Sequence, residues 1–211
     1  MLAMSRSLRL IVCLAALACA GCVLPVSEHP LSQDASSFVD ERLIGLWVSA
    51  EAEKEEPKDS PAEAFAIARK EGTRNTLEAT HTRIENEQLN VTALPFWLTK
   101  IGERPFISMT GDKPAEGYLI MHYEFLGEGP PDRLNLYLLN AKFIVEAIEG
   151  GRLAGAVKRK GGGKEGDVQS IRITAKPAAL AEFLKQSGRQ VLSEDPLPLK
   201  RIAGRGLAGK L

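Results

Sequence analysis

The sequence contains very little cysteine, and what it has is confined to one end. Among its 211 residues there are three, Cys13, Cys19 and Cys22. The chain beyond Cys22 therefore has no thiol for a disulfide or for a thiolate metal site. With 44% hydrophobic residues, that remainder is long enough to bury an ordinary core, which must supply its stability.

An excess of charge of either sign is also missing. Lysine and arginine together number 27, and aspartate and glutamate also number 27. This balance, together with the hydrophobic content, excludes a wholly disordered chain. It also excludes a nucleic-acid binder that works by bulk positive charge, so we expect no nucleic-acid partner.

Motifs for catalysis and for nucleotide or metal binding are absent as well. The sequence has no Gly-x-Ser-x-Gly and no His-Glu-x-x-His, and the glycine run 161–163 before Lys164 lacks the spacing of a phosphate loop. The histidines are His29, His81 and His122, and their spacing brings no partners together, so we interpret them as surface or hydrogen-bonded side chains. We expect no enzyme, no metal and no cofactor.

The N-terminus carries an apolar run that is too short to span a membrane. Arg6 and Arg9 precede uncharged residues 10–21, and Pro25 interrupts the run soon afterwards. A spanning helix needs about 20 apolar residues, whereas a basic start, a short apolar run and small residues at its end are typical of a secretory signal. We predict that residues 1–21 are this signal.

The end of the signal resembles the lipobox of bacterial lipoproteins, in which small residues precede the cysteine that receives lipid. Ala20, Gly21 and Cys22 match that pattern, while Cys19 is an alternative acceptor. The resemblance implies acylation of Cys22, and two or more acyl chains hold a protein firmly to a membrane. Because Val23 is not aspartate, it also implies a location in the cell envelope, at the periplasmic face of the outer membrane.

Beyond the signal, the chain divides by composition into three parts. Residues 22–37 are dotted with proline, serine and aspartate without a period, which predicts a flexible tether. Residues 38–190 form a single β-rich domain. Residues 191–211 are rich in proline and glycine and are predicted to fray.

Alternation of apolar and polar residues dominates the central part. It predicts strands near Leu77, in 89–98, 106–109, 117–126 and 134–138, and at 171–173. Asn140 is placed to cap a helix over 141–149, and Pro177 to open a second one. Residues 61–70 fit either a helix or a strand, with the helix slightly favoured by the capping box that begins at Ser60. The fold class is β-rich α+β: mainly antiparallel sheet, or a partly closed barrel, with two or three short helices.

Residues 40–47, Asp-Glu-Arg-Leu-Ile-Gly-Leu-Trp, resemble the opening of lipocalin-like barrels. The resemblance implies a barrel in which Gly45 allows close backbone approach and Trp47 fills the floor. The wider pattern from the signal cysteine to Trp47 also looks like a group of uncharacterised bacterial lipoproteins.

Two functions follow from this interpretation. The first is a binding module for a small apolar or lipid-derived ligand, with four residues as candidate lining: Phe96, Leu98, Tyr118 and Ile120. The alternative is a structural or assembly lipoprotein that contacts another envelope protein and has no ligand cavity.

A basic segment, residues 158–164, is a further candidate. Together with basic residues of the tail it could contact anionic headgroups, since each basic residue near such a surface contributes about 1 kcal/mol. A solvated loop and a frayed end explain the same residues and are the favoured interpretation.

Overall fold

Side chains alternate along most of the strands, so that one face of each strand points into a barrel and the other points outward. The structure is a computed structural model that describes residues 23–50, 64–85, 88–111, 117–127, 132–161 and 167–202. Within these residues, eight strands close into a single antiparallel ring, in which β6 pairs with both β5 and β7. In chain order they are β2 (Gly45–Ser49), β3 (Ala64–Arg69), β4 (Leu77–Glu85), β5 (Gln88–Ile101), β6 (Arg104–Thr110), β7 (Tyr118–Leu126), β8 (Arg133–Leu138) and β11 (Leu197–Arg201). The β-rich fold with a barrel is confirmed.

The barrel turns a corner along β5. The first part of this strand pairs with β4, and the last part pairs with β6. The exchange falls at Phe96, which lies opposite Leu77 on β4 and Met109 on β6. Where β4 leaves, Phe38 takes its place through a β-bridge to Leu98, so the edge of β5 stays covered.

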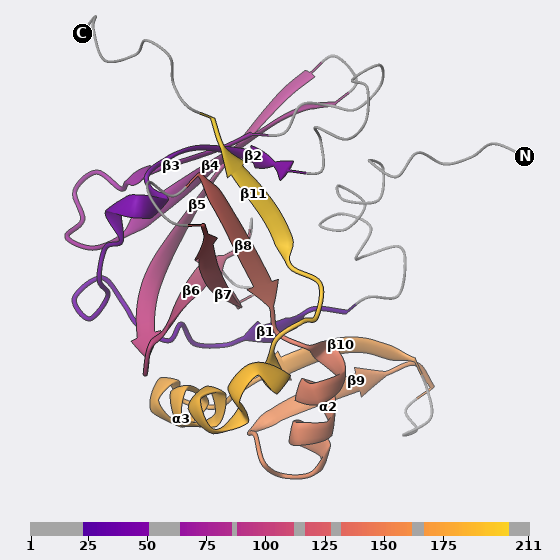
Figure 1. Cartoon of the computed structure of the whole chain (residues 1–211). Coiled ribbons are helices and arrows are strands. Elements are labelled where there is room, and N and C mark those ends of the chain that lie inside the picture. Colours follow the sequence, from indigo (N-terminus) through magenta and orange to yellow (C-terminus); the bar gives the residue numbers. More distant parts are fainter. Residues whose placement is uncertain are drawn as a thin grey trace, which may run out of the picture.

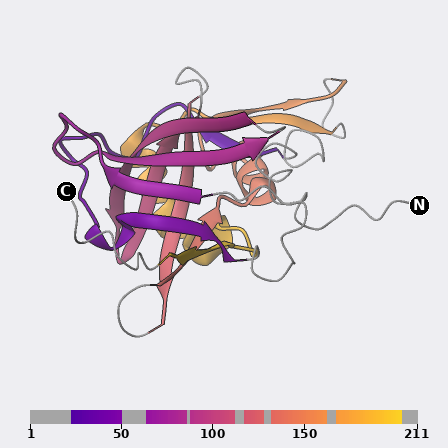
Figure 2. The same cartoon turned by 90° about the horizontal axis from the view of Figure 1, so that it is seen from above.

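A three-stranded extension continues the sheet from β7. The strand β1 (Pro25–Ser27) lies between β7 and β10 (Val168–Ile173), and β10 pairs with β9 (Gly155–Arg159). The approach of β1 to β7 requires a glycine at the start of β7, because a Cβ at Gly117 would lie 2.5 Å from the carbonyl oxygen of Ser27. Figure 2 shows the β9–β10 hairpin projecting from the barrel.

Two helices, α2 (Ala141–Glu149) and α3 (Pro177–Ser187), pack on the extension and on the outer face of the barrel (Figure 1). Both begin where the sequence predicts. The Asn140 side chain accepts a hydrogen bond from the Phe143 backbone N–H at 3.1 Å, and Pro177 occupies the first turn of α3. Two 3-10 turns, η2 (Glu41–Leu43) and η5 (Gly188–Val191), complete the described elements.

The buried side chains form two cores on opposite faces of the barrel wall. The inner core fills the barrel and contains Trp47, Phe96 and Tyr123. The outer core lies between the barrel wall, the extension and the helices, and contains Phe106 and Ile120. Strands β6 to β8 are therefore buried on both faces.

The structure corrects two predictions about the organisation of the chain, the flexible tether and the frayed tail, and decides one question that the sequence left open, the helix or strand at residues 61–70. The segment predicted as a flexible tether is part of the fold: it contains β1, and Ser27 is fully buried. Residues 64–69 form a strand, since cross-strand pairing with Trp47 and its neighbours on β2 overrides the helix signals. The predicted frayed tail contains β11, which pairs with both β2 and β8. The domain therefore extends on both sides of residues 38–190.

The pairing of β11 predicts the result of a truncation. A chain that ends at Asp195 lacks the strand between β2 and β8, so its ring is open and both neighbours lose a partner. We expect it to lack a cooperative unfolding transition, because domain stabilities are only about 5–15 kcal/mol. Urea unfolding followed by tryptophan fluorescence measures this. A chain that ends at Ile202 keeps β11 and should unfold like the full chain; similar unfolding of both truncated chains would contradict the prediction.

Candidate functional site: the floor and the mouth of the barrel

One end of the barrel is closed by Trp47 and the turn η2. The Trp47 side chain is fully buried, and its Nε1–H donates a hydrogen bond to the carbonyl oxygen of Leu43 at 2.8 Å. The Arg201 guanidinium lies 4.6 Å from the centre of the indole ring, a cation–π distance. It also donates a hydrogen bond to the carbonyl oxygen of Arg42, which ties β11 to η2. Trp47 therefore occupies the floor that the sequence predicts for it, and Gly45, at the start of β2, has a φ of 148°.

An ionic network beside the floor holds η2 against β7. The Asp40 carboxylate accepts hydrogen bonds from Arg42 at 2.9 and 2.7 Å and from the Tyr123 hydroxyl at 3.0 Å. Arg42 also lies over the ring of Phe125 at 4.6 Å. Burial alone would raise the pKa of Asp40, but the hydrogen bonds from Arg42 and Tyr123 outweigh it and keep that pKa below its usual value. Asp40 is therefore an anion that fixes the closed end.

Above the floor, large side chains fill the barrel. Phe96 and Leu98 lie here, and each is 1% exposed. They pack with Trp47, Tyr123 and Leu134 in the inner core. An eight-stranded barrel is just wide enough to be filled in this way, so the lower part of this barrel is solid core.

The opposite end of the barrel, its mouth, is lined by half-buried apolar side chains. These mouth residues sit at inward positions of their strands, toward the end away from the floor: Phe65, Leu94, Met109, Leu119, Leu138 and Leu197. His81 lies among them, with its ring stacked on Phe65 at 4.7 Å between centroids. The barrel thus has a sealed end and an apolar end that water reaches.

Two of the four candidate lining residues lie on the other face of the wall. Tyr118 and Ile120 point outward from β7; Ile120 belongs to the outer core, and Tyr118 packs against that core and makes an edge contact with Trp97 at 6.0 Å between centroids. The prediction that they line one cavity with Phe96 and Leu98 was therefore wrong. Because β7 is buried on both faces, the period-two pattern of its sequence sorts the side chains into two faces but does not show which face points into the barrel. The inward face carries Leu119 and Met121 instead.

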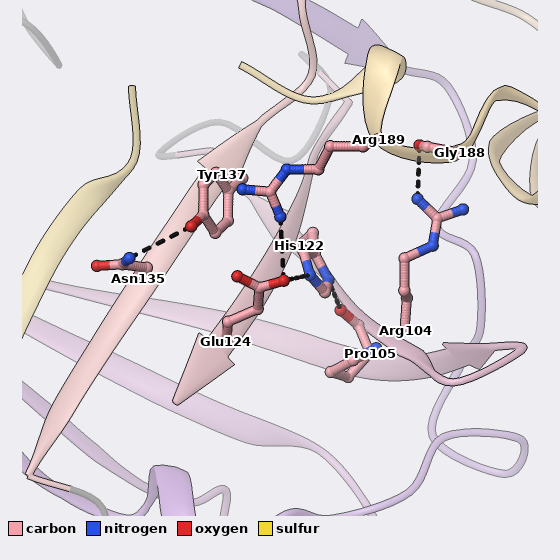
Figure 3. A network of polar contacts seen from close by, with 8 residues as sticks. All are labelled: Arg104, Pro105, His122, Glu124, Asn135, Tyr137, Gly188 and Arg189. Atoms are coloured by element: carbon pink, nitrogen blue, oxygen red, sulfur yellow. Dashed lines mark hydrogen bonds and ion pairs between the residues drawn. The ribbon is translucent and has the colours of Figure 1, made fainter. Parts of the chain in front are cut away.

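A second polar cluster lies on the outer face, where η5 meets the barrel (Figure 3). The His122 ring is almost fully buried; its Nδ1 lies 2.8 Å from the Pro105 carbonyl oxygen and its Nε2 lies 3.1 Å from the Glu124 carboxylate. Arg189 of η5 reaches the same carboxylate oxygen at 3.0 Å and covers the Tyr137 ring at 4.0 Å. Partial burial would raise the pKa of Glu124, but the hydrogen bond to His122 and the charge of Arg189 lower it overall.

This outer cluster fastens the end of α3 to the barrel. Arg104 contributes by donating a hydrogen bond to the carbonyl oxygen of Gly188 at 2.6 Å (Figure 3). It also donates one to the carbonyl oxygen of Leu184 at 2.6 Å. Every polar group named here has a partner within the protein, so the cluster has a structural role. For His122 this agrees with the prediction of a hydrogen-bonded histidine.

The remaining sequence candidates fall into two groups. Cys22 and its alternative Cys19 lie outside the described residues, as does Lys164. Lys158 and Lys160 are exposed at the end of β9. No group of three or more His, Cys, Asp or Glu residues in the described part of the chain could hold a metal ion. None of its described helices has the length and apolar character needed to cross a membrane.

Comparison with known proteins identifies no relative. No family model matches the chain, and neither a curated protein nor a solved structure matches it. The function must therefore be argued from the barrel itself.

The network at the floor predicts a pH dependence of stability. The pKa of Asp40 in the folded protein is lower than its value of about 3.9 in the unfolded chain. The ionised Asp40 carboxylate therefore stabilises the fold fully at a pH above the unfolded pKa, and this stabilisation is lost as the pH falls through the folded pKa. We expect Asp40→Asn to cost about 2 kcal/mol near neutral pH, the usual scale for hydrogen bonds to a charged group. The difference from the native chain should shrink in acid, as measured by urea unfolding across the pH range.

The control is Asp195→Asn, which removes an exposed carboxylate far from the floor. It should change stability little at any pH. A cost of Asp40→Asn that stays constant down to the lowest pH would contradict an ionised Asp40.

Proposed function

We propose that the protein is a lipid-anchored protein of the cell envelope whose barrel binds a small apolar or lipid-derived ligand at its mouth. The anchor is the acylated Cys22, and the location is the periplasmic face of the outer membrane. The protein acts by binding and not as an enzyme. The anchor and the location rest on the resemblance of residues 20–22 to a lipobox.

The observation that supports binding is the contrast between the two ends of the barrel. The floor is sealed by Trp47, Leu43 and the Asp40 network, whereas the mouth residues are apolar and only half-buried. Apolar side chains that remain in contact with water gain free energy when a ligand covers them, at about 25 cal/mol for each Å² buried. An apolar ligand at the mouth would cover them without displacing the core below.

The filled lower part of the barrel limits the ligand. Since Trp47 closes the floor, and Phe96 and Leu98 fill the space above it, a ligand has only the upper part of the barrel available. A single acyl chain that enters by its end fits this constraint better than a broad ring system. The same filled interior favours the alternative, a structural or assembly lipoprotein without a ligand, so the two functions must be separated by a binding measurement.

Leu138→Glu tests the binding function. A carboxylate at this position stands among the mouth residues, and an apolar ligand would have to desolvate it. We expect the native protein to bind a fluorescent polyene fatty acid and the variant to bind it at least about tenfold more weakly, a loss of about 1.4 kcal/mol. Fluorescence titration gives both affinities, and native mass spectrometry of protein purified from membranes shows any ligand that co-purifies.

The matched control is Val91→Glu, since Val91 is 57% exposed on the outward face of β5. It introduces the same charge outside the barrel and should leave binding unchanged. Native protein that neither binds the probe nor carries a ligand would reject the binding function and leave the structural lipoprotein.

The anchor is tested by replacing each cysteine in turn. Cys22→Ser should abolish the incorporation of labelled fatty acid into the protein in growing cells, because the thiol is the acyl acceptor. Cys19→Ser should leave incorporation intact. The reverse pattern would move the anchor to Cys19, and unchanged labelling of both variants would refute acylation at either site.

A further inference from the structure

The residues that the structure describes begin at Val23, directly after Cys22, the site of the proposed anchor. Val23 packs against the outer core, and β1 begins two residues later at Pro25. Consecutive Cα atoms are about 3.8 Å apart, so Cys22 cannot be far from a residue that is held in the fold. The anchor therefore has no long tether and holds one side of the protein at the membrane.

The strand register shows which side this is. β1 runs parallel to β10, with Pro25 opposite Ile171, so the chain before Pro25 lies toward the start of β10 at Val168. Val168 in turn pairs with Arg159 at the end of β9. The start of β1 and the tip of the β9–β10 hairpin are thus at the same end of the extension, as Figure 1 shows.

The hairpin presents lysines on the face opposite α2. Lys158 lies in β9 and Lys160 directly after the strand, on either side of Arg159, and both are exposed. Arg159 points to the other face, where it pairs with Glu149 of α2 at 2.9 Å. Ser170 of β10 lies opposite Lys158 on the lysine face and is also exposed.

Other charges near this face do not cancel the lysines. Arg172, farther along β10, forms an ion pair with Glu28 at 2.8 Å, so that pair contributes little net charge. Asp167 is the described acidic residue at the hairpin tip, and its carbonyl oxygen accepts a hydrogen bond from the Lys160 backbone N–H at 2.9 Å. With the two lysines, the tip keeps a positive excess among the described residues.

We propose that this lysine face, made by Lys158, Lys160 and Ser170, rests on an anionic phospholipid surface and sets the orientation of the anchored protein. The proposal depends on the proposed function, because the anchor supplies the proximity. The lysines then act over a short distance, where each is worth about a fivefold preference for an anionic surface. At distances beyond about 10 Å salt would screen the attraction, so the short reach from Val23 is essential.

The experiment uses the acylated full-length product, purified from membranes and reconstituted into vesicles. Ser170→Cys carries a fluorophore on the lysine face, and the vesicle lipids carry a quencher. We expect strong quenching in vesicles of equal parts phosphatidylglycerol and phosphatidylcholine, and weaker quenching in phosphatidylcholine alone. The same fluorophore at Gln186→Cys, which is exposed on α3, should be quenched little in either vesicle.

Charge reversal tests the role of the lysines. Lys158→Glu with Lys160→Glu should remove the preference for phosphatidylglycerol, whereas Lys142→Glu with Lys185→Glu makes the same charge change on the exposed surfaces of α2 and α3 and should preserve it. Equal quenching of the two reporters, or no effect of the first pair of substitutions, would overturn the proposal.

The mass of the reconstituted protein distinguishes a failure of the proposed anchor from a failure of the proposed lysine face. A mass without acyl groups would overturn the anchor in the proposed function, and with it the proximity on which the lysine face depends. An acylated mass together with equal quenching of the two reporters, or with no effect of Lys158→Glu with Lys160→Glu, would leave the anchor standing and overturn the lysine face alone.

Discussion

The structure depends on the closure of its hydrogen-bonded ring by β11. This strand comes from the last residues that the structure describes, yet it pairs on one side with β2 and on the other with β8. Its Arg201 covers Trp47 and joins η2, so the same strand that completes the wall also completes the floor. Without it, the inner core would have neither a continuous boundary nor a sealed end.

Local signals in the sequence were sufficient for the helices and for most of the strands. Asn140 and Pro177 mark helix starts by chemistry that acts within a few residues, and both predictions are confirmed. The alternation in 117–126 is equally local, because each strand position faces one side or the other whatever its neighbours are. Trp47 is fully buried in the inner core, which agrees with the place that the resemblance of residues 40–47 to a barrel opening implied for it.

What the sequence could not supply was the pairing between distant segments. Leu197–Arg201 is short and contains proline and basic residues, so two alternating leucines are its whole strand signal; it becomes a strand because β2 and β8 each offer an unpaired edge. The same reason applies to Ala64–Arg69, where the neighbours β2 and β4 decide against a helix. Tyr118 and Ile120 were assigned to the wrong face because burial on both sides of β7 hides which side is the interior. Leu197, a mouth residue, was missed for the same reason as its strand.

The placement of β1 has a mechanical consequence. This strand is parallel to β10 and antiparallel to β7, and its hydrogen bonds to both lie across its own axis. A pull on the chain from the side of Val23 acts along that axis, so it loads these bonds together in shear instead of opening them one at a time. Three residues wedged between two neighbours are thus arranged to resist detachment of the barrel from whatever holds its N-terminus.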